Sequence, residues 1–345
     1  ASRPRRGGRA ALSPSRAKDF MQCPLMFRLR TVDRLPDPGS LATHKGTLVH
    51  GVLERLYDLP ARERTREAAR AMLPSQWEAH REKSPAVMDL FADPAQIAPW
   101  LGEAEALIDA YFRMENPVRL EPAERELFVQ AETRDGLLLR GFVDRLDVAP
   151  DGAMRVVDYK TGRSPGPRFQ AEALFQMRFY ALVLWRLRGR APRRLQLLFL
   201  RDGRTLTHDP HLAELETVET KIARIWDEVE DCATAGEFAP RRSRLCDWCA
   251  FQAQCPLFGG TTPPVPEEGL ARLLTARRAE PPAGASGRGR AAADASSSYR
   301  LTGRKPPGQR RGRRPSVLSG ARQGGSRGRQ GPCLSHQILT HRRIL

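Results

Sequence analysis

Residues 141–162, GFVDRLDVAPDGAMRVVDYKTG, read as two β-strands joined by a tight turn. Pro150-Asp151-Gly152 is a natural three-residue hairpin loop, with glycine at the position that needs a left-handed backbone. That loop predicts the pairs Ala149–Ala153, Val148–Met154, Leu146–Val156, Asp144–Asp158 and Phe142–Lys160. Because side chains alternate in a strand, the first strand should present on one face Phe142, Asp144, Leu146 and Val148. The next strand should present on one face Met154, Val156, Asp158 and Lys160.

Two carboxylates, Asp144 and Asp158, are thus predicted to face each other among apolar neighbours. Like charges in that arrangement repel, and an unpaired buried charge is costly. A cation between them would remove both penalties, and carboxylates with open water positions suit Mg²⁺ or Mn²⁺. Lys160 points the same way and could orient a water or neutralise charge on a phosphorane. The alternative interpretation pairs Asp144 with a local arginine and makes Asp158 and Lys160 a surface ladder.

The sequence around the hairpin predicts alternating helices and strands. Residues 45–58 are the strongest helix, because their apolar side chains recur with helical period. Helices are expected over 13–29, 45–58, 61–83, 95–115, 171–187 and 214–230, and strands over 127–132, 137–148, 153–160 and 195–200. A helical arm followed by strands, a helix and a further strand predicts an α/β (mixed α+β) domain with a mixed sheet.

The net charge of +17 over 345 residues invites a nucleic-acid interpretation, but the charge lies at the ends of the chain. Residues 261–345 hold 17 Lys+Arg against 4 Asp+Glu, and residues 1–10 hold four arginines and no acid. The 250 residues between them carry 36 basic and 36 acidic side chains. Overall charge therefore does not make the central part a DNA-binding domain.

Three regions are expected from composition. Residues 1–12 are a basic flexible N-terminus, 13–260 a folded domain, and 261–345 a basic tail rich in Pro, Gly, Arg and Ser. The tail cannot bury enough apolar surface to offset its ordering entropy, so we expect it to be disordered. It is either a nucleic-acid-binding extension or a weakly constrained one. No secretory signal and no apolar run of about 20 residues is found, which favours a cytoplasmic protein without a membrane partner.

The spacing from Asp144 to Asp158-Tyr159-Lys160 resembles the signature of the PD-(D/E)XK nuclease superfamily. The sequence GFVDRLD…VVDYKTG is most similar to the RecB-type exonuclease branch of this superfamily. Gly46-Thr47-Leu48-Val49-His50 resembles the upstream helix of that branch, and Gln176 and Tyr180 match its Q-x-x-x-Y motif. The resemblance spans residues 13–258 and implies a restriction-endonuclease-like core with a helical N-terminal arm.

The resemblance also implies roles for these residues. Asp144, Asp158 and Lys160 would be catalytic, and Gln176 and Tyr180 would contact DNA. The metal ligands would be His50, Asp144, Asp158 and the Tyr159 backbone carbonyl. Taken alone, His50 could be a satisfied residue at the edge of a helix, and Gln176 and Tyr180 could be core residues of an apolar helix.

Cys246-Asp-Trp-Cys249 points two thiolates at one centre, and Cys255 follows six positions later. A fourth thiolate is needed to close a tetrahedral site or a cubane cluster. Cys23 and Cys232 are candidates, and the resemblance implies that Cys23, Cys246, Cys249 and Cys255 bind a [4Fe–4S] cluster. Spacing alone leaves Zn²⁺ open. A metal clip between these positions would join the two ends of the folded region.

The expected function is a Mg²⁺- or Mn²⁺-dependent deoxyribonuclease, an exonuclease of DNA repair or recombination that acts on single strands or strand ends. No Walker A motif is present, so a helicase partner would have to be a separate chain. The alternative is a non-catalytic nucleic-acid-binding module with a zinc or iron–sulfur clasp. A redox iron–sulfur protein fits poorly, because no dinucleotide-binding fingerprint follows a strand.

Overall fold

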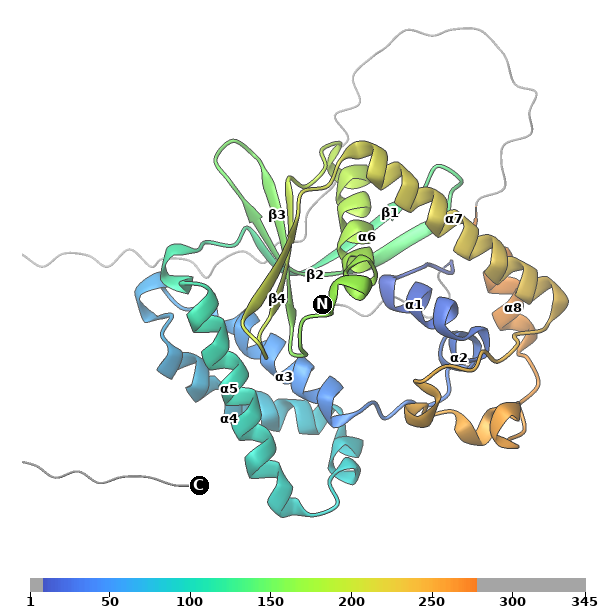
Figure 1. The fold of residues 1–345 in the computed structure, drawn as a ribbon, viewed down its shortest axis with the longest axis horizontal. Coiled ribbons are helices and arrows are strands. Elements are labelled where there is room, and N and C mark those ends of the chain that lie inside the picture. The colour runs from blue at the N-terminus through green and yellow to red at the C-terminus, as the bar shows by residue number, and fades with distance from the viewer. Residues whose placement is uncertain (1–8, 278–345) are drawn as a thin grey trace, which may run out of the picture. The chain divides into compact units, whose positions relative to one another are not determined.

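A computed structural model of the chain describes residues 9–277. Its centre is one five-stranded sheet with the order β1-β2-β3-β4-β5 (Figure 1). The strands are β1 (Glu124–Glu132), β2 (Leu138–Val148), β3 (Met154–Lys160), β4 (Arg194–Phe199) and β5 (Arg204–His208). Strands β3 and β4 are parallel and the other neighbours are antiparallel, so the expected mixed sheet is confirmed. The sequence did not predict β5.

The helices lie close to the predicted ranges. They are α1 (Pro14–Gln22), α2 (Pro24–Phe27), α3 (Leu41–Leu56), α4 (Arg66–Lys83), α5 (Ile97–Met114), α6 (Gln170–Arg188), α7 (Leu212–Ala235) and α8 (Glu267–Leu274). Ser13, Ser40 and Thr65 cap α1, α3 and α4 by accepting a backbone N–H through their hydroxyls. The predicted helix over 13–29 is interrupted at Cys23-Pro24, because proline cannot continue the hydrogen-bond ladder of α1.

Two apolar layers cover the two faces of the sheet. One layer packs α6, α7 and α1 against residues such as Val156 and Leu197, and the other packs α3, α4 and α5 against Val157 and Leu198. Figure 1 shows α6 and α7 on one side of the sheet and α3, α4 and α5 on the other. Neighbouring residues of β3 therefore belong to opposite layers, as strand alternation requires. None of the helices in the described part of the chain is long and apolar enough to cross a membrane.

The folded region extends beyond both expected boundaries. Leu12, placed in the flexible N-terminus, is buried; it accepts from the Arg140 N–H and donates to Leu138 O at 2.9 Å each. Helix α8 lies inside the segment expected to be a disordered tail, and its Leu273 is buried in the α6–α7 layer. Arg277 forms ion pairs with acids that include Asp227. The rest of the predicted tail, residues 278–345, lies outside the described residues.

Candidate active site

The β2–β3 hairpin has the predicted register near its turn. Leu146 pairs with Val156, and Val148 pairs with Met154. The ladder ends at Arg145–Val157, so the predicted backbone pairs Asp144–Asp158 and Phe142–Lys160 do not form. The Asp144 carboxylate instead accepts the Tyr159 N–H at 2.9 Å. The Asp144 side chain thus takes the place of a backbone acceptor, and β2 and β3 are no longer paired beyond Arg145–Val157.

Strands β1 and β2 each lose their alternation at the same level. Arg125 contacts Glu54 and Asp58 of the α3 region, and the next residue, Glu126, lies near His50 of α3. On β2, Asp144 contacts His50.

The residue after Asp144, Arg145, contacts Tyr57, which caps α3. Glu126 has φ of 44°, a left-handed backbone that is rare for a residue with a Cβ. Leu146 consequently belongs to the opposite, α6–α7 layer, which corrects the expectation that it shares a face with Asp144.

Three side chains converge at this distortion. Ligand atoms of His50, Glu126 and Asp144 all lie within 4.8 Å of one another. His50 Nε2 lies 2.8 Å from the Tyr159 carbonyl oxygen, and its Nδ1 lies 3.3 Å from Asp144 Oδ2. Asp144, His50 and the Tyr159 carbonyl are thus brought together as expected. Glu126 joins them, and it was not among the site residues expected from the sequence.

The electrostatics of the cluster favour a cation. Burial, and then the nearby charge of Asp158, raise the pKa of Asp144 well above its ordinary value. Burial also raises the pKa of Glu126, with added repulsion from Glu54 and Asp158. Two carboxylates and an imidazole form a donor set that suits a divalent metal ion, whose charge would relieve this repulsion. The residues present therefore fit a divalent metal ion.

Asp158 and Lys160 form a second group beside the first. The Lys160 Nζ lies 2.7 Å from Asp158 Oδ2 and donates to Gln176 Oε1 at 2.9 Å. Gln176 Nε2 donates to Asp158 Oδ1 at 2.8 Å, which closes a ring of three side chains. Asp158 is only 1% exposed, so this is not a surface ladder. Asp158 also stands outside the group of three described above.

Tyr180 contacts the Gln176 member of this group of three side chains. Its hydroxyl accepts from Gln176 Nε2 at 3.4 Å, and it hydrogen-bonds the main chain of Phe142. A Cβ added to Gly141 would lie 2.5 Å from the Tyr180 ring, so only glycine permits this contact. Tyr180 is buried, whereas Gln176 remains half-buried beside Lys160. The contact of both with DNA stays a prediction.

Arg145 is a buried arginine under the site that the sequence did not single out. It is 1% exposed and forms a paired hydrogen bond with Glu115, at 2.7 and 2.9 Å. It also donates to the Tyr159 hydroxyl at 2.8 Å and pairs with Asp147 at 3.1 Å. Arg145 therefore neutralises Glu115 and Asp147 rather than Asp144. Its hydrogen bond also holds the side chain of Tyr159, the residue whose carbonyl oxygen contacts His50.

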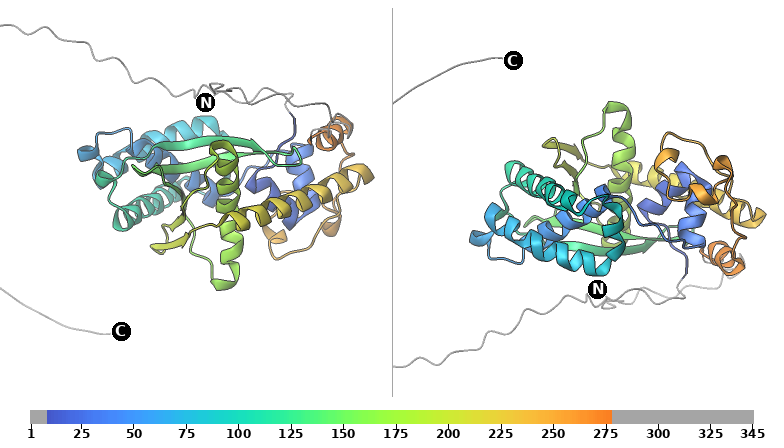
Figure 2. Two further views of the ribbon diagram at one scale, coloured as in Figure 1. Left: turned by 90° about the horizontal axis from the view of Figure 1, so that it is seen from above. Right: turned by 90° about the horizontal axis from the view of Figure 1, so that it is seen from below.

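The cysteines gather where α1 and α2 meet the segment before α8. Cys23, Cys249 and Cys255 pack against the same small apolar cluster. Burial raises the pKa of Cys249, and Cys23, Cys246 and Cys255 all lie close enough to raise it further. Figure 2 shows the blue N-terminal helices beside the orange segment that contains residues 246–255. None of the five cysteines in the described region forms a disulfide.

Backbone N–H groups already point at these sulfurs. Arg241 N–H donates to Cys23 Sγ at 3.4 Å, and Ser243 N–H donates to Cys246 Sγ at 3.3 Å. Such donors stabilise thiolates. Cys232 lies on α7, and burial followed by the charges of Asp231 and Glu228 raises its pKa.

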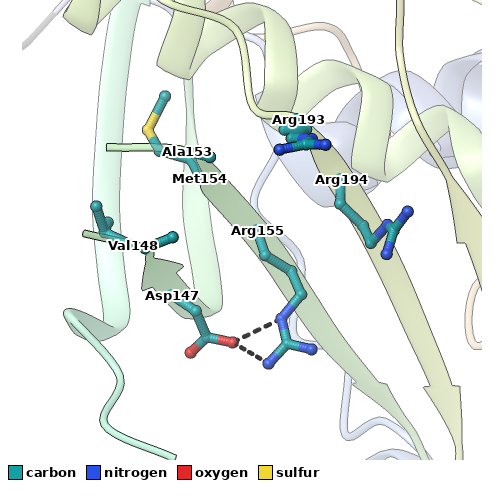
Figure 3. A pocket seen from close by; sticks show the side chains of 8 residues that line it. Asp147, Val148, Ala153, Met154, Arg155, Arg193 and Arg194 are labelled. Carbon is teal, nitrogen blue, oxygen red and sulfur yellow. Dashed lines mark hydrogen bonds and ion pairs between the residues drawn. The ribbon is translucent and has the colours of Figure 1, made fainter. Parts of the chain in front are cut away.

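A separate pocket of about 380 Å³ lies at the other end of β3, the end that begins with Met154. Figure 3 shows Arg155 paired with Asp147 at its wall, with Arg193 and Arg194 opposite. No predicted site residue lines it. The candidate active site is therefore the cluster at the end of β3 that carries Asp158 and Lys160.

Comparison with known proteins gives a family and two related phage proteins. The family model of the PD-(D/E)XK nuclease superfamily matches residues 11–256. The Gene 69 protein of Mycobacterium phage D29 is 24% identical over 276 residues, covering 71% of this chain and 96% of the phage protein. The Gene 69 protein of Mycobacterium phage L5 is 30% identical over 127 residues, covering 36% and 41%.

Among solved structures, one that is similar to this chain is a protein from Eubacterium rectale that is provisionally named an exonuclease. It has a TM-score of 0.45 and 15% identity, and the match covers 69% of this chain and 86% of that one. The range matched by the family model contains every residue of the candidate active site and all four clustered cysteines.

Proposed function

Because the chain belongs to the PD-(D/E)XK nuclease superfamily, we propose that it is a Mg²⁺- or Mn²⁺-dependent deoxyribonuclease. The observation that carries the proposal is the convergence of His50, Glu126 and Asp144 within 4.8 Å. The Lys160 ammonium lies beside this group, held by Asp158 and Gln176. Carboxylates with raised pKa values beside a fixed lysine are typical of catalytic sites.

The side chains divide the work as follows. The cation would be held by His50, Glu126, Asp144 and the Tyr159 carbonyl. Asp158 would add a further negative charge near it. When bound, the cation would polarise the scissile phosphate and lower the pKa of a bound water. Lys160 is held at a fixed place by Asp158 and Gln176, where its ammonium would stabilise charge that develops on the phosphate. Gln176 orients Lys160, because its amide bonds both Lys160 and Asp158.

We propose that the enzyme is an exonuclease of DNA repair or recombination that acts on strand ends. We place it in the cytoplasm, with a separate helicase chain as a partner. The support is the set of ordered motifs that resembles the RecB-type branch. The test compares linear single-stranded DNA labelled at the 5′ or 3′ end with a circular single strand. An exonuclease degrades the linear strand from one labelled end and leaves the circle intact. Cleavage of the circle at an equal rate would contradict strand-end action.

We further propose that Cys23, Cys246, Cys249 and Cys255 hold a structural [4Fe–4S] cluster. Cys23, Cys246 and Cys255 all lie close enough to Cys249 to raise its pKa, which supports a shared site. A tetrahedral zinc site with bonds of about 2.3 Å needs sulfurs roughly 3.8 Å apart, whereas a cluster keeps them wider. Iron and zinc analysis after anaerobic purification distinguishes the two.

The second candidate function is a non-catalytic nucleic-acid-binding module with the same clasp. It shares the cysteines and the basic termini but does not need Lys160 beside Asp158. Metal-dependent cleavage that is lost with Lys160→Met excludes this alternative.

A further inference from the structure

Two exposed phenylalanines lie next to the catalytic acids. Phe128 on β1 and Phe142 on β2 are directly paired, with ring centroids 5.3 Å apart and planes inclined by 53°. They are 47% and 49% exposed. Phe128 is two residues from Glu126, and Phe142 is two residues from Asp144. Residues two apart in a strand share a face, so the rings lie on the face that carries the acids.

The backbone under these rings is fixed rather than mobile. Val129 and Gly141, the neighbouring pair, face the opposite, α6 side, where Val129 is buried and Gly141 abuts Tyr180. The Tyr180 hydroxyl hydrogen-bonds the main chain of Phe142. The aromatic surface is therefore held in place before any ligand binds, which lowers the entropic cost of binding.

A cationic side chain continues the same face of β2. Arg140 precedes Phe142 by two residues, and no described residue forms an ion pair or a side-chain hydrogen bond with its guanidinium. Along β2 the order is thus a half-buried arginine, an exposed aromatic ring and an acid of the candidate site, at steps of roughly 7 Å. A single DNA strand offers phosphates for the arginine and bases for the aromatic ring. An apolar protein surface offers no partner for the arginine.

We propose that Phe128 and Phe142 form a stacking platform for unpaired bases beside the scissile phosphate, with Arg140 contacting a neighbouring phosphate. The inference rests on the proposed nuclease function and extends it to single-stranded DNA as the substrate form. Bases stack on aromatic side chains whatever their identity, so the platform is tolerant of sequence. Bases inside a duplex are already stacked and paired, and they cannot cover these rings without being unstacked.

The experiment measures KM and kcat on a linear oligothymidylate and on a matched strand with abasic sites near the cleaved end. Wild-type protein should show a KM about tenfold higher on the abasic strand, because stacking is worth roughly one order of magnitude or more per base. The double variant Phe128→Ala/Phe142→Ala should show the raised KM on both strands, with kcat changed less than twofold. Phe142→Trp, which keeps a stacking surface, should retain the wild-type preference.

The matched control is Leu212→Ala, which truncates another exposed apolar side chain, on α7. It should leave both constants unchanged. A small phosphodiester without flanking bases, bis(4-nitrophenyl) phosphate, reports on the catalytic centre alone.

If wild-type protein cleaves neither DNA nor this ester, the nuclease proposal fails. If it cleaves DNA but the double variant keeps the wild-type KM and abasic discrimination, only the platform is refuted. A dimeric wild type together with a monomeric double variant of unchanged KM would identify the face as an interface between copies and overturn the proposal.

Discussion

Glu126 and Asp144 lie opposite each other on β1 and β2, between the ladder pairs Arg125–Arg145 and Leu127–Val143. At this level both strands turn two consecutive side chains toward α3, and Glu126 adopts a positive φ. The distortion brings two carboxylates to His50 that a regular sheet would have directed elsewhere. Backbone strain of this kind persists where the surrounding structure enforces it, and it is concentrated at functional sites.

Glu126→Gln tests whether this residue belongs to the metal site. Glutamine keeps the shape and the backbone strain but removes the charge, so the Mg²⁺ concentration for half-maximal activity should rise about tenfold, with kcat largely recovered at high Mg²⁺. Glu124→Gln, at the start of the same strand, is the matched control and should leave the Mg²⁺ dependence unchanged. Equal metal dependence in Glu126→Gln and wild-type protein would remove Glu126 from the site.

Asp144→Asn should inactivate the enzyme but stabilise the metal-free protein at high pH. The folded state raises the pKa of Asp144 above its ordinary 3.8, so it binds a proton that the unfolded chain has released. Stability without metal therefore falls as the pH rises from about that value through the raised pKa. Asparagine cannot ionise and still accepts the Tyr159 N–H. The expected gain at pH 8 in EDTA is on the order of 1–2 kcal/mol.

Urea unfolding at pH 4 and pH 8 measures this effect. The two proteins should converge at pH 4, and added Mg²⁺ should stabilise only the wild type. A variant less stable than wild type at pH 8 in EDTA would show that Asp144 is not electrostatically strained.

Arg145→Met should destabilise the whole domain. The guanidinium is buried between Glu115 and Asp147, and its removal leaves Glu115, among the described residues, with only the more distant Arg155, 3.8 Å away, as a cation. Loss of one partner from a buried ion pair costs roughly 3–5 kcal/mol. Arg194→Met, which removes an exposed pair with Asp209, should cost about 1 kcal/mol or less. Comparable free energies of unfolding for the two variants would mean that the Arg145 network contributes little.

Cys23→Ser should release the iron and lower the thermal midpoint, although the nuclease residues are untouched. The two ends of the folded region meet at these sulfurs, so their loss frees the segment 241–260 from α1. Cys232→Ser should keep both iron and stability. Iron retained in Cys23→Ser but lost in Cys232→Ser would identify a different fourth ligand.

The hairpin could be predicted because its loop and its alternation are local properties of the chain. Asp144, Asp158 and Lys160 lie near one another for that reason. The role of Glu126 could not be predicted, since no residue type in β1 announces a positive φ. The strand β5, Arg-Thr-Leu-Thr-His, has little apolar pattern because it is an edge strand with one partner. Leu12 and Leu273 become ordered through contacts with distant residues, which composition does not report.

The most direct test of the account is cleavage of end-labelled single-stranded DNA by anaerobically purified protein, with Mg²⁺, with Mn²⁺ and with EDTA. Lys160→Met serves as the matched inactive variant, with its fold verified by circular dichroism. The account predicts cleavage in either metal, none in EDTA, and a loss of at least about a hundredfold in Lys160→Met. Undiminished cleavage in EDTA, or wild-type activity in Lys160→Met, would contradict it.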